Sequence, residues 1–434
     1  MGMRTVYLDH AATTPLDPRV REAMLPYLSD EFGNPSALYR QGRRAKEAIE
    51  TARKKVSGVL GCNADEIIFT GSGTESDNMA IFGIARAYAN RGKQIIISAI
   101  EHHAVLNSAE QLKKQGFDKV VLPVDAHGLV DPKVLQAAIT PETTLVSIMY
   151  ANNEIGTIEP IRELAKAVRD WKKENGRSPL EPPFFHTDAC QAAGYLEMDV
   201  RKLGVDLLTI NGSKIYGPKG TGVLFVRRGL RVEPIVFGGG QENRLRSGTE
   251  NVAGIVGLAE ALMIASAERE IESLRLTSLR DKLISGIMER VPKVVPNGHP
   301  IERLPNNVNV SILDIEGEAV LLYLDAKGVA AATGSACDSA SLDPSHVIIA
   351  IGRPYEHAHG SIRFSLGRET TEDDVNYVLE VLPGIVETLR SISPVSLAMG
   401  KQDPFAAAFV SLGRPHWEKA KQVADRQSPR VNTI

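Results

Sequence analysis

Cysteine is scarce in this 434-residue sequence, which contains only Cys62, Cys190 and Cys337. An odd, sparse set of thiols excludes a disulfide framework and is typical of a reducing compartment. The chain also has no apolar run of the ~20 residues that a membrane-spanning helix needs. No signal or transit pattern precedes the segment VYLDHAATTP. We therefore expect a cytoplasmic protein without a membrane segment.

An excess of either charge is lacking as well. The chain has 50 Lys and Arg against 53 Asp and Glu, a formal net charge of −3. Without a basic surplus, nucleic acid is not predicted as a direct partner. The 43% hydrophobic and 24% charged residues are typical of a globular protein, and the length suggests two or three domains.

Strand-like and helix-like segments alternate through the first half of the chain. The predicted strands are 66–70, 94–99, 145–150, 184–187, 205–210 and 222–228. Such alternation predicts an open, mainly parallel α/β sheet. Ligands of such sheets bind outside the carboxyl ends of the strands.

One lysine stands where a predicted strand ends. Residues 205–210 are mostly apolar and precede a turn-forming Asn-Gly pair, followed by Ser213 and Lys214. Desolvation favours the neutral amine of a lysine, and a neutral amine attacks carbonyl groups. This is what a lysine needs to hold pyridoxal 5′-phosphate (PLP) as a Schiff base. A surface lysine in a glycine-rich turn explains the segment equally well.

Polar side chains follow five of the predicted strands: Thr74, His102, Asn153, Asp188 with Gln191, and Lys214. A single Asp or His at a strand end is more often a cap or a satisfied hydrogen-bonding group. Five at one edge of a sheet predict a ligand site.

The segment around Thr74 has the geometry of a phosphate site. A predicted strand leads into Gly71-Ser72-Gly73-Thr74 and then into a helix. Backbone N–H groups at a helix N-terminus bind phosphate. The match to a P-loop is poor, because no Gly-Lys-Ser/Thr follows. An ordinary capped helix fits this motif about as well.

The pattern changes after Val252. A long helix over Val252–Arg290 is predicted to lead into a smaller unit with the strand-like segments NVNVSIL and SIRFSLG. We expect an N-terminal arm (1–17) packing with the small unit, a large domain (18–262), a small domain (263–393) and a tail (394–434).

Two residues of the small unit carry chemistry. Cys337 lies among small and polar residues, which favours a reactive thiol on a flexible loop over a buried, inert one. Arg363 is suited to bind a carboxylate, although a structural ion pair is the common alternative. His357 and His359 lack further ligands at metal spacing, so no metal site is predicted.

The chain resembles the group I cysteine desulfurases of the NifS/IscS type, which are fold-type I PLP enzymes of the class V aminotransferase superfamily. The resemblance covers nearly the whole chain except the tail. The segments that carry it are FGNPS, TGSGTESDN, EHHAVL, NNEIG, HTDACQ, SKIYGPKG, RSGTEN, GSACDSAS and SIRFSLGR. It implies a mainly parallel seven-stranded sheet flanked by helices in a large domain, plus a smaller α+β domain.

The resemblance also implies a role for each matching residue. Lys214 would hold PLP, Asp188 would pair with its ring nitrogen, and His102 would stack on its ring and move protons. Gln191 would bind its phenolic oxygen, and Asn153 and Arg363 would orient the cysteine substrate. Cys337 would take the sulfur as a persulfide, leaving alanine. The implied phosphate ligands are Gly73, Thr74, Asn211, Ser213 and, from the neighbouring subunit of a homodimer, Thr249.

The chain departs from the family pattern at the lysine turn. Asn211 and Ser213 stand where the family usually has Ser and His. Both replacements keep hydrogen-bonding capacity but remove an imidazole. The sulfur acceptor is expected to be an iron–sulfur scaffold or a tRNA-thiolation enzyme.

Two other functions are compatible with the sequence. Selenocysteine lysis or transamination would use the same PLP residues without needing Cys337 as an acceptor. A non-catalytic scaffold in a sulfur-transfer complex is the third reading, but it does not need Lys214 and Asp188, which are both present.

Overall fold

The computed structural model describes residues 4–334 and 344–393. Its centre is a seven-stranded sheet of order β2-β8-β7-β6-β5-β3-β4. The strands are β2 (Ile67–Thr70), β3 (Gln94–Ser98), β4 (Asp118–Leu122), β5 (Thr143–Ser147), β6 (Phe184–Asp188), β7 (Leu207–Asn211) and β8 (Gly222–Val226). Only β8 runs against its two neighbours, so β2 points the same way as the other strands. The predicted seven-stranded, mainly parallel sheet is confirmed.

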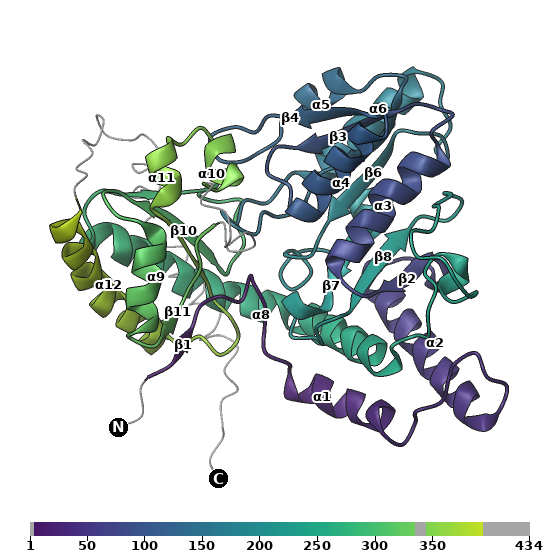
Figure 1. Ribbon diagram of the computed structural model, residues 1–434, viewed down its shortest axis with the longest axis horizontal. Coiled ribbons are helices and arrows are strands. Elements are labelled where there is room, and N and C mark those ends of the chain that lie inside the picture. The colour runs from purple at the N-terminus through teal and green to yellow at the C-terminus, as the bar shows by residue number, and fades with distance from the viewer. Residues whose placement is uncertain (1–3, 335–343, 394–434) are drawn as a thin grey trace, which may run out of the picture.

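Helices cover both faces of this sheet (Figure 1). Alternate side chains of a strand point to opposite faces, and in β3 Ile95 and Ile97 join one core cluster while Ile96 joins the other. The first face is covered by α3 (Gly73–Ala87) and α4 (His103–Lys114). The second is covered by α2 (Arg40–Leu60), α5 (Pro132–Ala138), α6 (Ile161–Glu174), α7 (Val200–Leu203) and the start of α8 (Val252–Arg290). The strands are therefore buried on both faces, as their branched, apolar sequences require.

A smaller antiparallel sheet lies at the other end of α8 (Figure 1). In it β10 (Asn307–Ile312) lies between β9 (Val294–Pro296) and β12 (Ser361–Ser365). The end of α8 packs against it together with α9 (Gly317–Asp325) and α12 (Glu372–Ile392). The short helices α10 (His346–Ala350) and α11 (Tyr355–His359) lie on the side of the large sheet.

The N-terminal arm joins the two sheets. Its strand β1 (Val6–Tyr7) pairs in parallel with β11 (Val329–Ala330). It then leads into α1 (Pro18–Met24) and the 3-10 turn η1 (Leu25–Leu28), beside α8. The remaining 3-10 turns are η2 (Ala64–Glu66), η3 (Gly212–Lys214) and η4 (Glu242–Arg244).

Some elements differ from the sequence prediction. The long helix has the predicted bounds, whereas the strand predicted over 145–150 ends at Ser147. The short elements β4, α5, α7 and β9 were not predicted. The division into domains at residues 17, 262 and 393 stays a prediction, and the tail (394–434) lies outside the described residues. Within residues 4–334 and 344–393, none of the helices combines the length and apolar character needed to cross a bilayer.

Candidate active site

The predicted polar residues meet at the carboxyl edge of the large sheet. Asp188 is the last residue of β6, and His102 caps α4 directly after β3. Asn153 lies in the turn after β5, and Lys214 ends η3, which follows β7. The strands run in the same direction, so their carboxyl ends bring these side chains to one place.

Lys214 contacts the N-terminal arm. Its Nζ donates hydrogen bonds to the carbonyl oxygens of Ala11 (2.9 Å) and Ala12 (2.5 Å). Gln191 Nε2 donates to the same Ala11 oxygen at 2.9 Å. The Thr14 N–H donates to the Ser213 carbonyl oxygen at 2.9 Å. The arm therefore crosses the site, which the sequence did not indicate.

Asp188 is buried and rests on an uncharged layer. Its Oδ1 accepts a hydrogen bond from the Cys190 N–H at 2.9 Å. His186 precedes it by two residues on the same strand face and bonds Ser147 Oγ (2.8 Å) and Thr209 Oγ1 (3.1 Å). Burial lowers the pKa of His186 to about 4, so the imidazole is neutral at neutral pH.

Asp77 of α3 completes that layer. It is fully buried, with Oδ1 3.7 Å from His186 Nε2. Burial, and then the nearby Asp188 carboxylate, raise the pKa of Asp77 well above its ordinary value. Burial therefore favours the protonated form of Asp77, which limits the negative charge that this layer places behind Asp188.

His102 lies within electrostatic reach of both Asp188 and Lys214. Its Nδ1 accepts from the Ala104 N–H at 3.1 Å, which places the proton of the neutral ring on Nε2. Burial lowers the pKa of His102, the Asp188 carboxylate opposes that shift, and Lys214 adds to it. The hydrogen bond to Nδ1 therefore orients the imidazole ring at the start of α4, a position suited to stacking on a planar ligand.

The turn before α3 provides a place for an anion. Ser72 caps the helix by accepting from the Glu75 N–H at 3.1 Å, so Gly73 and Thr74 form the first turn, where N–H groups have no earlier helical carbonyl. A Cβ on Gly73 would lie 2.7 Å from Cys190 Sγ, so only glycine fits there.

The lysine turn lies next to this helix start. A Cβ on Gly73 would lie 3.2 Å from Asn211 Cβ, so the two segments are in close contact. Asn211 Oδ1 accepts from both the N–H and the Oγ of Ser213, each at 3.0 Å. The two replaced side chains therefore orient each other.

These residues fit PLP. The cofactor carries a phosphate, a basic ring nitrogen and an aldehyde, which match a helix N-terminus, a buried carboxylate and a lysine respectively. Across residues 4–334 and 344–393 there is no group of three His, Cys, Asp or Glu placed to hold a metal ion.

Arg363 forms an ion pair with Asp9, which is the structural alternative that the sequence left open to binding a substrate carboxylate. Its Nη2 donates to Asp9 Oδ1 at 2.8 Å, and its Nη1 donates to the Asn153 carbonyl oxygen at 3.0 Å. Its Nε is buried and makes no hydrogen bond within the described part of the chain. Arg363 therefore lies beside Asn153, held by a carboxylate of the arm that the sequence had not singled out.

Two of the three cysteines, Cys62 and Cys190, lie within the described residues. Burial raises the pKa of Cys62 to about 12 and that of Cys190 well above its ordinary value, so both thiols are unreactive near neutral pH. Cys337, the predicted sulfur acceptor, lies outside the described residues.

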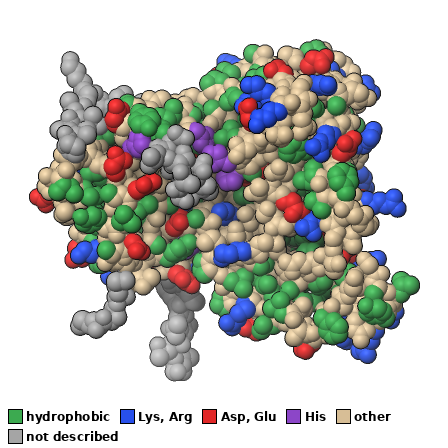
Figure 2. Space-filling view, viewed as in Figure 1, with side chains coloured by type: hydrophobic (Ala, Val, Ile, Leu, Met, Phe, Trp, Pro, Cys, Tyr) green, Lys and Arg blue, Asp and Glu red, His purple; other side chains and the backbone are tan. Residues whose placement is uncertain are grey.

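Histidine side chains gather on the face between the two sheets (Figure 2). The rings of His102 and His103 are 6.3 Å apart between centroids, and those of His103 and His346 are 5.0 Å apart. His346 belongs to α10, so this group links the small unit to the carboxyl edge of the large sheet.

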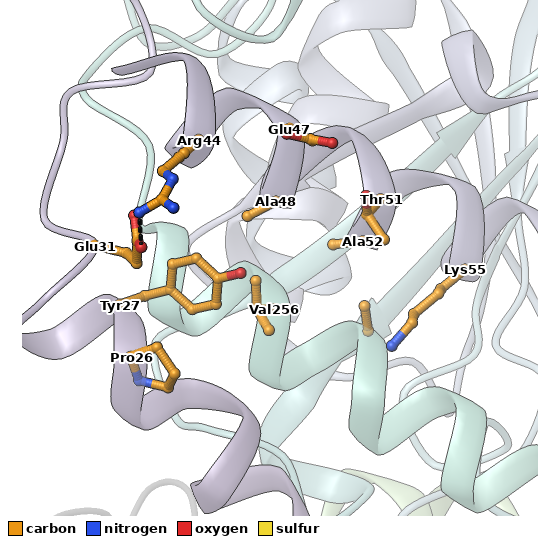
Figure 3. Close-up of a pocket in the computed structure, with 11 residues that line it drawn as sticks. Pro26, Tyr27, Glu31, Arg44, Glu47, Ala48, Thr51, Ala52, Lys55 and Val256 are labelled. Atoms are coloured by element: carbon orange, nitrogen blue, oxygen red, sulfur yellow. Dashed lines mark hydrogen bonds and ion pairs between the residues drawn. The ribbon is translucent and has the colours of Figure 1, made fainter. Parts of the chain in front are cut away.

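A cavity of about 520 Å³ lies elsewhere, between η1, α2 and α8 (Figure 3). Tyr27, Thr51, Lys55 and Val256 line it, and Glu31 pairs with Arg44 beside it. None of the predicted site residues lines this cavity. We place the site by its chemistry, at the edge of the sheet.

Known proteins resemble this chain over most of its length. The family model described as aminotransferase class-V matches residues 6–378. The chain is 52% identical over 391 residues to the cysteine desulfurase IscS of Dictyoglomus turgidum, covering 90% of this chain and 97% of that protein. It is 52% identical over 393 residues to the cysteine desulfurase IscS of Methanosarcina thermophila, covering 91% and 95%.

Solved structures agree with these relatives. A NifS-like protein superposes with a TM-score of 0.82 at 36% identity, covering 89% of this chain and all of that one. A NifS-like protein from Rickettsia africae superposes with a TM-score of 0.78 at 31% identity, covering 88% and 100%.

Proposed function

We propose how the site works in this chain, which belongs to the class-V aminotransferase family and is one of its PLP-dependent cysteine desulfurases. The reaction converts L-cysteine to L-alanine and leaves the sulfur on the enzyme as a persulfide. When bound, PLP supplies a reactive carbonyl and an electron-withdrawing ring that stabilises negative charge on the substrate carbon. The residues described above do the rest.

Lys214 holds the cofactor covalently and exchanges protons with the substrate. Its Nζ is held by the carbonyl oxygens of Ala11 and Ala12. Two backbone acceptors orient the amine without introducing a competing charge. The arm thus restricts the lysine to the carboxyl edge of the sheet.

Asp188 binds the ring nitrogen and keeps it protonated. The Cys190 N–H fixes Oδ1 of this carboxylate. His186 beneath it is neutral, and burial favours the protonated form of Asp77, which supports Asp188 as the counter-ion of the ring nitrogen. A buried ion pair of this kind is strong where its geometry is fixed.

Five residues hold the phosphate in this proposal. The first turn of α3 supplies Gly73 and Thr74, and the positive end of the helix dipole favours an anion. Asn211 and Ser213 add polar side chains from the neighbouring turn. Thr249 comes from a second copy of the chain.

His102 covers the ring and carries a proton, and Gln191 binds the phenolic oxygen. The proton of the neutral His102 ring is on Nε2, because Nδ1 accepts from the Ala104 N–H. Asn153 and Arg363 bind the substrate carboxylate. That carboxylate competes with Asp9, which now occupies the Arg363 guanidinium.

Cys337 takes the sulfur. Its thiolate attacks the substrate sulfur, and the carbon–sulfur bond breaks with its electron pair staying on carbon. Protonation of that carbon gives L-alanine, while the two sulfurs remain joined on the enzyme. The high pKa values of Cys62 and Cys190 leave Cys337 for this role.

A homodimer completes the site. Thr249 is exposed, on a segment whose Phe237 is 79% exposed. Phe32 and Leu38, before α2, are 75% and 89% exposed. Large exposed apolar side chains are typical of a surface that another chain covers, and Thr249 belongs to the same exposed segment as Phe237.

The partners are L-cysteine and a sulfur-acceptor protein. We propose an iron–sulfur scaffold or a tRNA-thiolation enzyme as the acceptor, in the cytoplasm and without direct contact to nucleic acid. The meeting of Lys214, Asp188 and His102 at one sheet edge supports the cofactor chemistry most strongly.

Incubation of the PLP-loaded protein with L-cysteine and a reductant tests the function. We expect alanine and sulfide in equal amounts. Formation of a keto acid without sulfide would instead indicate an aminotransferase, and activity on selenocysteine alone would indicate a selenocysteine lyase. Absence of turnover with both L-cysteine and selenocysteine would indicate a scaffold.

A further inference from the structure

One buried carboxylate, that of Glu154, lies beside the residues that flank the segment 335–343. Ser345 follows that segment, and its Oγ donates a hydrogen bond to Glu154 Oε2. Gly334 precedes it, and a Cβ on Gly334 would lie 2.3 Å from the same Glu154 oxygen and 3.2 Å from Ser345 Cβ. Gly334 and Ser345 therefore both lie against one oxygen of Glu154, a residue far from them in sequence.

Glu154 is itself fixed in place. It is 4% exposed, and its N–H donates to Asn152 Oδ1 at 2.8 Å. Its carbonyl oxygen accepts from the side-chain amides of Asn307 (3.1 Å) and Asn309 (3.2 Å) in β10. It directly follows Asn153, whose carbonyl oxygen holds Arg363. Its position is thus set by the turn that forms the substrate end of the proposed site.

The chain before Gly334 is tied to the same place. Ala332 pairs with Arg363 through two backbone hydrogen bonds, at 3.0 and 2.6 Å. Gly334 lies two residues further on, against Glu154. The backbone just before the segment 335–343 therefore cannot shift without also moving Arg363.

The chain after Ser345 is anchored to the large sheet. Ser345 Oγ caps α10 by accepting from the Ile348 N–H at 3.2 Å. The apolar face of α10 packs on side chains from beyond β3 and β5, including Ile100 and Ile155. His346 Nε2 is 3.0 Å from the Glu101 carbonyl oxygen. The residues on both sides of the segment 335–343 are therefore held next to the strand ends that carry the proposed site.

We propose that Glu154 is a positioning residue for sulfur transfer. It holds Gly334 and Ser345 together at a fixed place beside Asn153 and Arg363. The inference rests on the proposed role of Cys337, which lies between Gly334 and Ser345 in sequence. Glu154 contacts no reacting atom in this account, so it acts only through what it fixes.

Position 334 requires glycine because the Glu154 side chain lies against its backbone. The close approach of the carboxylate leaves no room for a Cβ, whose closest real contacts exceed 3.0 Å. Burial raises the pKa of Glu154 to about 7, while the Ser345 hydroxyl and the Arg363 guanidinium oppose that rise. A Cβ at position 334 would therefore force either Gly334 or the Glu154 side chain to move.

The test compares Gly334→Ala with Gly384→Ala in the PLP-loaded full-length protein. Gly384 lies in α12, and a Cβ there would meet no atom within 4 Å. For Gly334→Ala we expect cofactor affinity, the absorbance change on adding cysteine and KM to stay at parent values. We expect kcat for sulfide release to fall roughly tenfold to a hundredfold, as for a misplacement of about 1 Å. Gly384→Ala should match the parent throughout.

A second variant guards against simple misfolding. Glu154→Asp is one methylene shorter, so it withdraws the oxygen from Ser345 and from an added Cβ alike. If Glu154 positions both residues, Glu154→Asp should itself lower kcat while KM and cofactor affinity stay at parent values, and adding it to Gly334→Ala should cost little more, because both changes disturb the same contact. The rate of Cys337 alkylation, measured by peptide mapping, should change in both single variants.

Three outcomes would overturn the inference: parent-like kcat in either single variant, a rise in KM together with the fall in kcat, or losses that multiply as independent effects in the double variant. Cys337→Ala is assayed alongside. If Cys337→Ala still releases sulfide at the parent rate, the proposed function fails, whatever Gly334→Ala does. If Cys337→Ala is inactive and Gly334→Ala is not impaired, only the inference fails.

Discussion

Replacing Glu242 by alanine is the sharpest stability test that this fold offers. Glu242 lies in η4 and Arg53 in α2, and their side chains are 4% and 10% exposed. Arg53 Nη2 and Nη1 donate to the two carboxylate oxygens at 2.7 and 3.0 Å. The same carboxylate accepts from the Phe69 N–H of β2 at 2.9 Å. The pair thus ties the segment that carries Thr249 to the strand that leads into the phosphate turn.

Glu242→Ala leaves the buried Arg53 guanidinium with only the half-exposed Glu50 carboxylate, 3.5 Å from its Nε, as a counter-charge. Breaking a buried pair by removing one partner costs about 3–5 kcal/mol. Asp65→Ala is the matched control, because Arg228 and Asp65 are also 2.7 Å apart but are 64% and 56% exposed. An exposed pair contributes only ~0–1 kcal/mol.

The segment held by this pair has a strained backbone. Glu242, Asn243 and Arg244 have φ values of 43°, 57° and 66°, a region that costs side-chain-bearing residues energy. Without the ion pair the strain is free to relax, and Thr249 loses its fixed place. We therefore expect Glu242→Ala also to weaken PLP binding.

Urea unfolding of the apoproteins, followed by circular dichroism, measures the stability difference. Titration with PLP measures the affinity. A large drop in the midpoint for Glu242→Ala and a small one for Asp65→Ala are expected. Equal midpoints for the two variants would refute the reasoning.

Three further predictions follow from the site. Cys337→Ala should bind PLP and show the absorbance change with cysteine but release almost no sulfide, and full sulfide release from it would exclude the mechanism. Mixing Lys214→Ala and Thr249→Ala chains should restore one of the two sites in each mixed dimer, roughly a quarter of all sites after random exchange. No recovery after confirmed exchange would mean that Thr249 serves its own chain. Burial raises the pKa of Glu159 from 4.5 to about 8, so the folded state favours the protonated acid, and its stabilising contribution is lost as pH rises between these values. Glu159→Gln should therefore gain stability relative to the parent between about pH 4.5 and about pH 8, and urea midpoints that shift in parallel would contradict this.

The strands and long helices were predictable because their signals are local. Branched, apolar segments between turn residues predicted the large sheet, and the run Val252–Arg290 predicted the longest helix with its bounds. Short elements such as β4 and α5 were missed because β4 is partly exposed and α5 has only seven residues. Neither has a strong period of apolar residues.

The edge of the site was predictable for the same reason. Parallel strands bring their carboxyl ends together, so Asp188 and Lys214 could be grouped without knowing their contacts. The contacts of the arm could not be predicted, since Asp9 and Ala11 meet Arg363 and Lys214 across more than 200 residues of sequence. The need for glycine at 334 could not be predicted either, because it depends on the Glu154 carboxylate, which is far from it in sequence.

The central claim is that Lys214 holds the cofactor at this sheet edge. The most direct measurement is to reduce the PLP-loaded protein with borohydride, digest it and map the lysine that carries the pyridoxyl group. The account predicts the label on Lys214, where Asp188 and His102 lie within electrostatic reach. A label on Lys219 or on any other lysine would contradict it.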